Sequence, residues 1–172
     1  MKKLIVCFCT ALALSFAACT DDGNDKNGND SNTNPAEKFV GKWNVDYTAN
    51  LTVTTDMIGE RNVNVPTRHT TATITLDGTE GRVKVLMDGH NATGVADEKG
   101  LHLDKQSYSE TMQDLPIDFL QDLPIDFTIT HNTIPNPVDG KMSWTSNANG
   151  NVSYSGLNIP VTGTMSYTAT KQ

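Results

Sequence analysis

Residues 42–53 alternate strictly between apolar and polar side chains, and this feature constrains the fold more than any other. The apolar set is Trp43, Val45, Tyr47, Ala49, Leu51 and Val53, and the polar set is Lys42, Asn44, Asp46, Thr48, Asn50 and Thr52. Alternation of period two is typical of a β-strand with one buried face. Residues 159–170 repeat the pattern, with Ile159, Val161, Met165, Tyr167 and Ala169 on the apolar face. The sequence predicts two long, half-buried strands.

Shorter strands are predicted between these two. The candidate ranges are 61–66, 70–77, 82–88, 91–97, 101–109, 123–131, 140–146 and 151–156. Turn dipeptides separate them: Asp77-Gly78, Asp88-Gly89, Lys99-Gly100, Asp139-Gly140 and Asn149-Gly150. No helical pattern lies between the strands, which excludes a parallel α/β sheet. We therefore predict an all-β fold, an antiparallel up-and-down β-barrel of about 8–10 strands, with a β-sandwich as the alternative.

The barrel and the sandwich differ in how the two long strands relate. In an up-and-down barrel with an even number of strands, the first and last strands pair and remove both sheet edges. We expect residues 43–53 to pair with part of 158–170. A sandwich would place the two strands in different sheets or leave one at an edge.

One segment is duplicated: residues 113–119 recur unchanged as 121–127. The prolines in each copy disfavour a central strand, because proline cannot donate to the ladder. We expect the second copy to lead into a strand over 125–131 and the first to form a loop or one helical turn with Asp114 as N-cap. The role of the duplication stays open. Its aspartates are expected to face solvent: Asp114, Asp118, Asp122 and Asp126.

The first 34 residues are predicted to contain a targeting signal and a polar linker, and no folded domain. Residues 1–18 combine Lys2 and Lys3 with a short apolar stretch that ends in small residues, which predicts a signal peptide. Residues 20–34 contain no apolar side chain, which predicts a disordered polar tether. The domains expected are therefore a signal peptide (1–18), Cys19 with the tether (19–34), and the barrel (35–172). All three cysteines lie at or before position 19, so the barrel has no disulfide.

The run Ser15-Phe16-Ala17-Ala18-Cys19 resembles the lipobox of bacterial lipoproteins, although leucine is usual where Phe16 stands. The resemblance implies cleavage before Cys19 and a lipid on its thiol, which would hold the protein on a membrane. Asp21-Asp22 resembles the acidic export tag of Bacteroidetes lipoproteins displayed on the cell surface. The location implied is the outer membrane, with the cell surface favoured over the periplasmic face.

Phe39-Val40-Gly41-Lys42-Trp43 resembles the opening of calycin barrels, the superfamily of lipocalins and fatty-acid-binding proteins. Together with the lipobox, this is similar to the calycin-like or lipocalin-like lipoproteins of Bacteroidetes. The resemblance implies that Trp43, with Gly41, plugs one end of the barrel. The chain departs from the family in three ways. It lacks a central Thr-Asp-Tyr motif and a helical lid, and its last strand offers Lys171 instead of an arginine to cover the tryptophan.

Catalytic and metal chemistry find little support in the sequence. Histidines stand at 69, 90, 102 and 131 without metal-ligand spacing, so we expect no metal and no cofactor. Gly-x-Ser-x-Gly is absent, and we expect no enzyme. The chain has 13 Lys+Arg against 20 Asp+Glu, a net charge of -7. That balance argues against nucleic acid as a partner.

Two functions remain, and they differ in what fills the barrel. In the first, the lumen binds a small hydrophobic or glycan-type ligand through Tyr47, Phe127, Trp144 and Tyr167. In the second, these side chains pack the lumen, and a non-catalytic cell-surface protein contacts a partner through its Thr/Asn-rich outer face. Small residues ringing an open lumen would favour the first: Ala49, Ala92, Gly94 and Ala96. The oligomeric state stays open.

Overall fold

Nine antiparallel strands form a single sheet in the computed structural model, which describes residues 34–56, 59–111 and 123–172. A short 3-10 helix, η1 (Glu37–Phe39), precedes them. The strands are β1 (Gly41–Thr55), β2 (Gly59–Leu76), β3 (Arg82–Met87), β4 (His90–Ala96), β5 (Leu101–Leu103), β6 (Gln106–Thr111), β7 (Pro124–His131), β8 (Lys141–Tyr154) and β9 (Leu157–Lys171). The prediction of an all-β, antiparallel up-and-down fold is confirmed.

Several predicted features lie outside the described residues. They are the signal peptide, Cys19, the polar tether, the first copy of the duplicated segment, and Asp114, Asp118 and Asp122. The second copy is described from Leu123 onward and leads into β7, as predicted.

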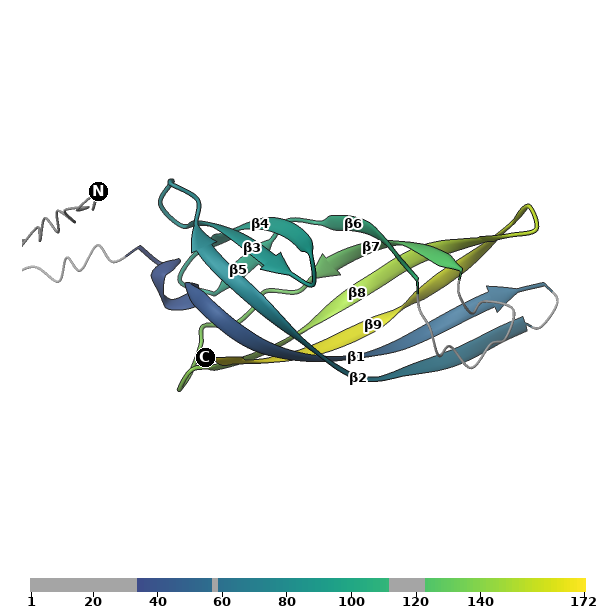
Figure 1. The fold of residues 1–172 in the computed structure, drawn as a ribbon, viewed down its shortest axis with the longest axis horizontal. Coiled ribbons are helices and arrows are strands. Elements are labelled where there is room, and N and C mark those ends of the chain that lie inside the picture. Colours follow the sequence, from purple (N-terminus) through teal and green to yellow (C-terminus); the bar gives the residue numbers. More distant parts are fainter. Residues whose placement is uncertain (1–33, 57–58, 112–122) are drawn as a thin grey trace, which may run out of the picture. The chain divides into compact units, whose positions relative to one another are not determined.

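The first and last strands pair along most of their length. β1 and β9 are in register from Trp43↔Lys171 to Val53↔Val161, which confirms the pairing expected of a barrel. The sheet order is β5-β4-β3-β2-β1-β9-β8-β7-β6, so the two long strands lie at its centre. The sheet curls into a half-barrel in which β1, β2, β8 and β9 run along the whole length and β3, β4 and β5 occupy one end (Figure 1).

The two outermost strands, β5 and β6, run in the same direction, because an even number of antiparallel pairings separates them in the sheet. Only Asp104 and Lys105 connect them along the chain. β5 and β6 are thus two parts of one strand that is broken at these two residues. The first part pairs with β4 and the second part pairs with β7. Counted in this way, the sheet has eight strands. Its ladder of hydrogen bonds is interrupted at Asp104-Lys105, where the broken strand leaves β4 and joins β7.

The strand boundaries correct the sequence prediction in three places. Ranges 61–66 and 70–77 form one strand, β2, and the register shift opposite Pro66 and Thr67 shows a bulge where proline cannot donate. Ranges 140–146 and 151–156 likewise form one strand up to Tyr154, β8. Range 101–109 is divided at Asp104-Lys105.

Asn149-Gly150 is not a turn, contrary to the prediction. Both residues lie within β8, paired with Thr162 and Val161. Glycine is needed there because a Cβ atom would lie 2.8 Å from the Asp126 carbonyl oxygen and 2.8 Å from Phe127 Cδ1. The β8–β9 turn is instead Ser155-Gly156, with positive φ at both residues. The other four predicted turn dipeptides do lie between strands.

The inner face of the sheet carries the core. In β1 and β9 the alternating apolar side chains are buried and the Thr/Asn side chains between them are mostly exposed, as the period-two pattern predicts. Polar side chains form continuous rows across the outer face; one row runs Asn62, Thr52, Thr162, Asn149, Thr128 and Ser107. Among the described residues, no helix is long and apolar enough to cross a membrane.

Candidate functional site

Trp43 and Gly41, which the calycin resemblance makes a plug, lie at the start of β1, and we call this end of the barrel the closed end. Trp43 is fully buried, and its Nε1 donates a hydrogen bond of 2.8 Å to the carbonyl oxygen of buried Phe39. The Lys171 Nζ lies 5.5 Å from the Trp43 ring centroid. Gly41 adopts φ 136°, and a Cβ there would lie 3.0 Å from Lys171 Cε. Lys171 thus covers the Trp43 ring, at the place where the calycin family has an arginine.

Hydrogen bonds to backbone groups hold the chain in place around the plug. Asn34 Oδ1 accepts hydrogen bonds from the backbone N–H groups of Ala36 and Gly81, which fixes the approach to η1. Leu101 and Ile134 exchange two backbone hydrogen bonds, of 2.8 and 2.9 Å. They join β5 to the segment that follows β7. At this end, therefore, the chain surrounds the core.

Asp97, His102 and Thr133 form an acid–imidazole–hydroxyl arrangement beside this closed end. His102 Nε2 lies 3.3 Å from Asp97 Oδ2, and its Nδ1 lies 3.3 Å from Thr133 Oγ1. The backbone N–H of Lys99, followed by His102 and Gly100, lowers the pKa of Asp97. Because these side chains are solvent-exposed and their contacts are long, the arrangement holds two loops together rather than activating a nucleophile.

The predicted lumen residues are packed inside the barrel. The Trp144 and Tyr167 rings stack with centroids 4.8 Å apart and planes at 2°, and Tyr47 lies 5.7 Å from Tyr167. Phe127 is also buried, but it belongs to a second group in which Tyr108 lies 6.4 Å from Phe127 and 4.3 Å from His90. The structure brings three of the four predicted residues together and places the fourth beside rings that the sequence analysis did not select.

His131 is the interior residue that the sequence analysis missed. Trp144 Nε1 donates to its Nδ1 at 3.3 Å, and Ser146 Oγ lies 2.6 Å from the same nitrogen. Because indole is only a donor, Nδ1 accepts and the proton of the neutral ring is on Nε2. Nε2 has no hydrogen-bond partner among the described residues. Burial lowers the pKa of His131 from 6.5 to about 4.

A regular position on a strand is the signal that could have identified His131. Ile129 and His131 are two residues apart on β7, as are Trp144 and Ser146 on β8, and His131 pairs with Ser146. His69 and His102, by contrast, lie on the outside. In the described part of the chain, no group of three His, Cys, Asp or Glu side chains is placed to hold a metal ion.

The described side chains that line the lumen leave little free space between them. Two cavities lie along it, of about 30 Å³ and 20 Å³. The larger is bordered by Tyr47, His90, Tyr108, His131 and Tyr167, and the smaller by Trp144, Leu101 and Ile134. Sites for small ligands occupy about 300–1,000 Å³, whereas these cavities have room for water molecules only.

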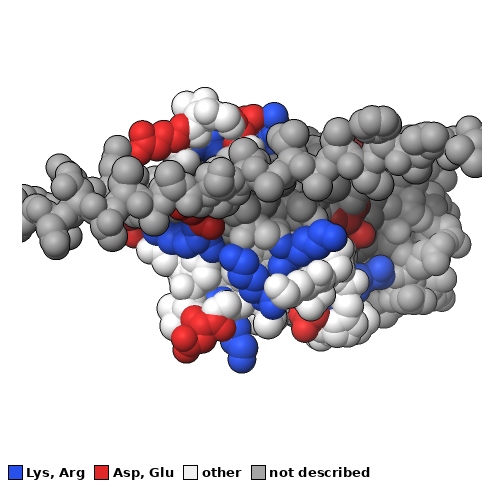
Figure 2. Space-filling view, turned by 60° about the vertical axis from the view of Figure 1, so that its left-hand side comes forward, with Lys and Arg blue, Asp and Glu red and all other residues white. Residues whose placement is uncertain are grey.

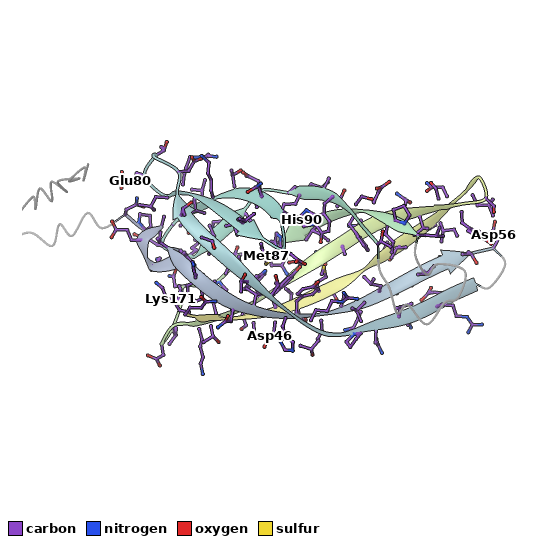
Figure 3. The ribbon with its side chains drawn as sticks, in the orientation of Figure 1. Asp46, Asp56, Glu80, Met87, His90 and Lys171 are labelled. Atoms are coloured by element: carbon purple, nitrogen blue, oxygen red, sulfur yellow. The ribbon has the colours of Figure 1, made fainter. Side chains whose placement is uncertain are left out.

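A larger hollow lies on the outside, where β4 and β6 separate. It encloses about 380 Å³ and is lined by Gly89, His90, Asn91, Ala92, Thr93, Asp104, Lys105, Gln106, Ser107 and Tyr108. We call it the β4/β6 groove. Thr93 Oγ1 donates to Asp104 Oδ2 at 2.5 Å at its inner end. Met87 and His90 mark this place midway along the sheet, between Glu80 at one end and Asp56 at the other (Figure 3).

Charges of both signs cover the surface near the closed end. Figure 2 shows a band of Lys and Arg side chains with Asp and Glu side chains beside it. Such mixing favours local ion pairs, such as Lys84 Nζ–Asp77 Oδ1 at 2.5 Å, over a field of one sign.

Comparison with known proteins leaves the family undetermined. No model of a known protein family matches the chain, and no curated protein matches it. The resemblance of Phe39–Trp43 to calycins stays a prediction.

Proposed function

We propose that this chain is a non-catalytic interaction protein: a calycin-like barrel anchored to the outer membrane through a lipid on Cys19. The observation that carries this proposal is the filled lumen. Trp144, Tyr167 and Tyr47 occupy the space where a ligand would lie, and the two cavities beside them, bordered by described residues, measure about 30 Å³ and 20 Å³. Contacts with a partner then use the outer surface.

The outer face contains two kinds of surface that could serve this role. The rows of Thr, Asn and Ser are uncharged and lack the Trp, Tyr and Arg side chains that dominate protein interfaces. They suit contact with water. The β4/β6 groove is concave and is bordered by strand edges, so it is the better place for a specific contact.

A titration distinguishes the packed barrel from a lumen that binds ligand. The chain contains two tryptophans, so a Trp43→Phe variant reports the fluorescence of Trp144 alone. Fatty acids, haem and short glycans are added in turn. We expect no saturable change, because the Trp144–Tyr167 stack already fills the lumen. Saturable quenching by any of these ligands would reject the packed barrel in favour of a small-ligand carrier.

The anchor is tested by replacing the proposed lipid site. Cys19→Ser should abolish both labelling by a palmitate analogue and partition into membranes. Cys7→Ser and Cys9→Ser are the matched controls, because both residues precede the proposed cleavage site and should leave labelling unchanged. A Cys19→Ser protein that still partitions with membranes would contradict the lipoprotein assignment. Protease treatment of intact cells then distinguishes the cell surface, which we propose, from the periplasmic face.

A further inference from the structure

Three lysines lie together at the closed end of the barrel. Lys42, Lys141 and Lys171 are exposed and belong to β1, β8 and β9, which are neighbours in the sheet. Lys171 pairs with Trp43, the residue after Lys42, and Lys141 pairs with Thr170, the residue before Lys171. Because neighbouring strands are about 4.8 Å apart, the three Cα atoms lie within roughly 15 Å of one another. We call these three residues the closed-end lysines.

The side-chain charges of these three strands are unevenly distributed. β8 and β9 contain no Asp or Glu, and β1 contains Asp46, whose Oδ1 lies 2.6 Å from His69 Nδ1. The carboxylate closest along the chain to Lys141 is Asp139, in the turn before β8. Within the mixed charges of the closed end, the ends of these strands therefore present positive side chains. Lys171 lies at the same end as Glu80, opposite Asp56 (Figure 3).

A shallow hollow beside Lys141 adds polar and apolar groups to this surface. It measures about 420 Å³, and Lys141, Ser143, Thr168, Thr170 and Val138 are among the residues that line it. Val138 is 70% exposed. Hydroxyl and ammonium groups donate hydrogen bonds to phosphate oxygens. A phosphate group next to apolar surface, as in the head group of a phospholipid, suits this combination.

The chain enters the barrel at the same end. Asn34 Oδ1 accepts hydrogen bonds from the backbone N–H groups of Ala36 and Gly81, and η1 leads directly into β1. The polar tether predicted for residues 20–34 would have a root-mean-square span of about 20 Å and a limit of about 50 Å. The turn between β8 and β9 lies at the opposite end of the sheet (Figure 1). A lipid on Cys19 would therefore hold the closed end nearer to the membrane than that turn.

We propose that the closed end of the barrel rests on an anionic membrane surface, with the closed-end lysines bound to the phosphate groups of the lipids. The proposal rests on the lipid anchor proposed above and adds a defined orientation to it. A lysine close to an anionic membrane strengthens binding about fivefold, so three lysines contribute about a hundredfold. Because the tether already confines the barrel near the lipids, this contact is strong enough to orient it.

The test measures the orientation of the mature, lipidated chain on vesicles. The chain is incorporated into phosphatidylcholine vesicles with or without phosphatidylglycerol, and an acceptor dye is attached to a lipid head group. Thr79→Cys at the closed end, or Ser155→Cys in the β8–β9 turn, carries the donor dye; both positions are exposed. In anionic vesicles at low salt we expect more energy transfer from position 79 than from position 155. High salt should reduce this difference, because it screens the lysines.

Substitutions assign the orientation to the lysines. Replacing all three closed-end lysines by glutamine should remove the difference between the two donor positions. The matched control replaces Arg61, Arg68 and Lys105 by glutamine, with the same change in net charge. Arg61 and Arg68 pair with Val53 and Tyr47, and Lys105 lies between β5 and β6, all away from the strand ends at the closed end. This control should keep the difference. Thermal unfolding checks that both variants fold, and the lipid and salt comparisons need no substitution in the lysines.

Two results would overturn the proposal. Equal transfer from both positions in anionic vesicles would show that the closed end does not rest on the membrane. An equal difference in neutral vesicles would show that the tether, and not the lysines, orients the barrel. Flotation of the vesicles distinguishes these results from failure of the anchor. A chain that floats with neither kind of vesicle would reject the lipid on Cys19 and the docking with it, whereas a floating chain with equal transfer would reject the docking alone.

Discussion

The closed end and the open half of this barrel bury similar side chains in different ways. At the closed end, Trp43 and Phe39 fill the cross-section, and the chain is fastened around them by Asn34 and the Leu101–Ile134 bridge. In the open half, β2, β1, β9, β8, β7 and β6 continue without β3, β4 and β5. The side chains buried there are mainly β-branched, among them Val53, Val63, Ile125, Val152 and Val161.

The difference concerns where the free energy of folding is concentrated. A large aromatic plug with fixed backbone contacts concentrates free energy at the closed end. Where β5 ends, no strand among the described residues pairs with His90 and Asn91 of β4 on that side. We therefore expect mutations at the plug to affect unfolding more than mutations beside the β4/β6 groove.

Truncating the plug should have the largest effect. Trp43→Ala should lower the free energy of unfolding by about 3–5 kcal/mol, the range for a buried tryptophan or phenylalanine. Val152→Ala, at a fully buried position of the open half, should cost about 2 kcal/mol, since it removes two methylene equivalents at about 0.8 kcal/mol each and leaves a small cavity. Urea unfolding measures both. Equal losses would show that the plug has no special role.

Acidification should act through His131 in the middle of the barrel. Its folded pKa of about 4 lies below the unfolded value of 6.5, so the unfolded chain binds a proton in this interval and the folded chain does not. The stabilisation is complete above about pH 6.5 and is lost as the pH falls to about 4, by about 3 kcal/mol. His131→Phe should flatten this dependence in urea unfolding at several pH values. The pKa of Asp97, at the closed end, lies below its ordinary value of 3.8. Protonation of Asp97 therefore lowers stability only at a pH below about that value. A decline confined to below pH 4 would exclude His131 as its cause.

Adding one methyl group where β1 and β9 pair should have an intermediate effect. Gly163 pairs with Leu51, and a Cβ there would overlap the Asn50 carbonyl oxygen and lie 2.8 Å from Leu51 Cα. Gly163→Ala should cost about 1–3 kcal/mol through backbone displacement. Thr162→Ala, on the exposed face next to it, should change stability by about 0.5 kcal/mol or less. If thermal unfolding shows Gly163→Ala to be neutral, the close approach of the strands is wrong.

Removing the charge above the plug should have the smallest effect. Lys171→Gln should cost about 0.5–1 kcal/mol, the range for a cation over an aromatic ring at an exposed site. Lys141→Gln is the matched control, because Lys141 is exposed at the same end of the neighbouring strand β8. Urea unfolding in low and high salt compares the two. An equal loss in both variants would assign the effect to net charge.

Local alternation predicted the parts of the fold that depend on a single strand. The pattern of Trp43–Val53 gave β1 its buried face, and the matching pattern at the C-terminus gave β9, so their pairing followed. Asp88-Gly89 gave a two-residue turn because both residues tolerate positive φ, which they adopt.

Features that depend on the neighbouring strand could not be read from the sequence. Asn149-Gly150 has the composition of a turn, but Gly150 is there to admit the backbone of β7. Residues 101–109 form two strands because the first part pairs with β4 and the second with β7. No local pattern in the sequence encodes this change of neighbour. His131 seemed isolated along the chain and became part of the interior only through its pairing with Ser146.

Residue-resolved amide hydrogen exchange compares the paired strands at the centre of the sheet with the β4/β6 groove, because it measures each strand of the ladder separately. We predict slow exchange along Trp43–Val53 in β1, which has a partner strand on both sides. We predict fast exchange at alternate residues of His90–Thr93, because no described strand pairs with this stretch of β4 on the side of the β4/β6 groove. Uniformly slow exchange in both segments would show that the hydrogen-bond ladder on β4 continues past Gly94 and that the two regions do not differ in this way.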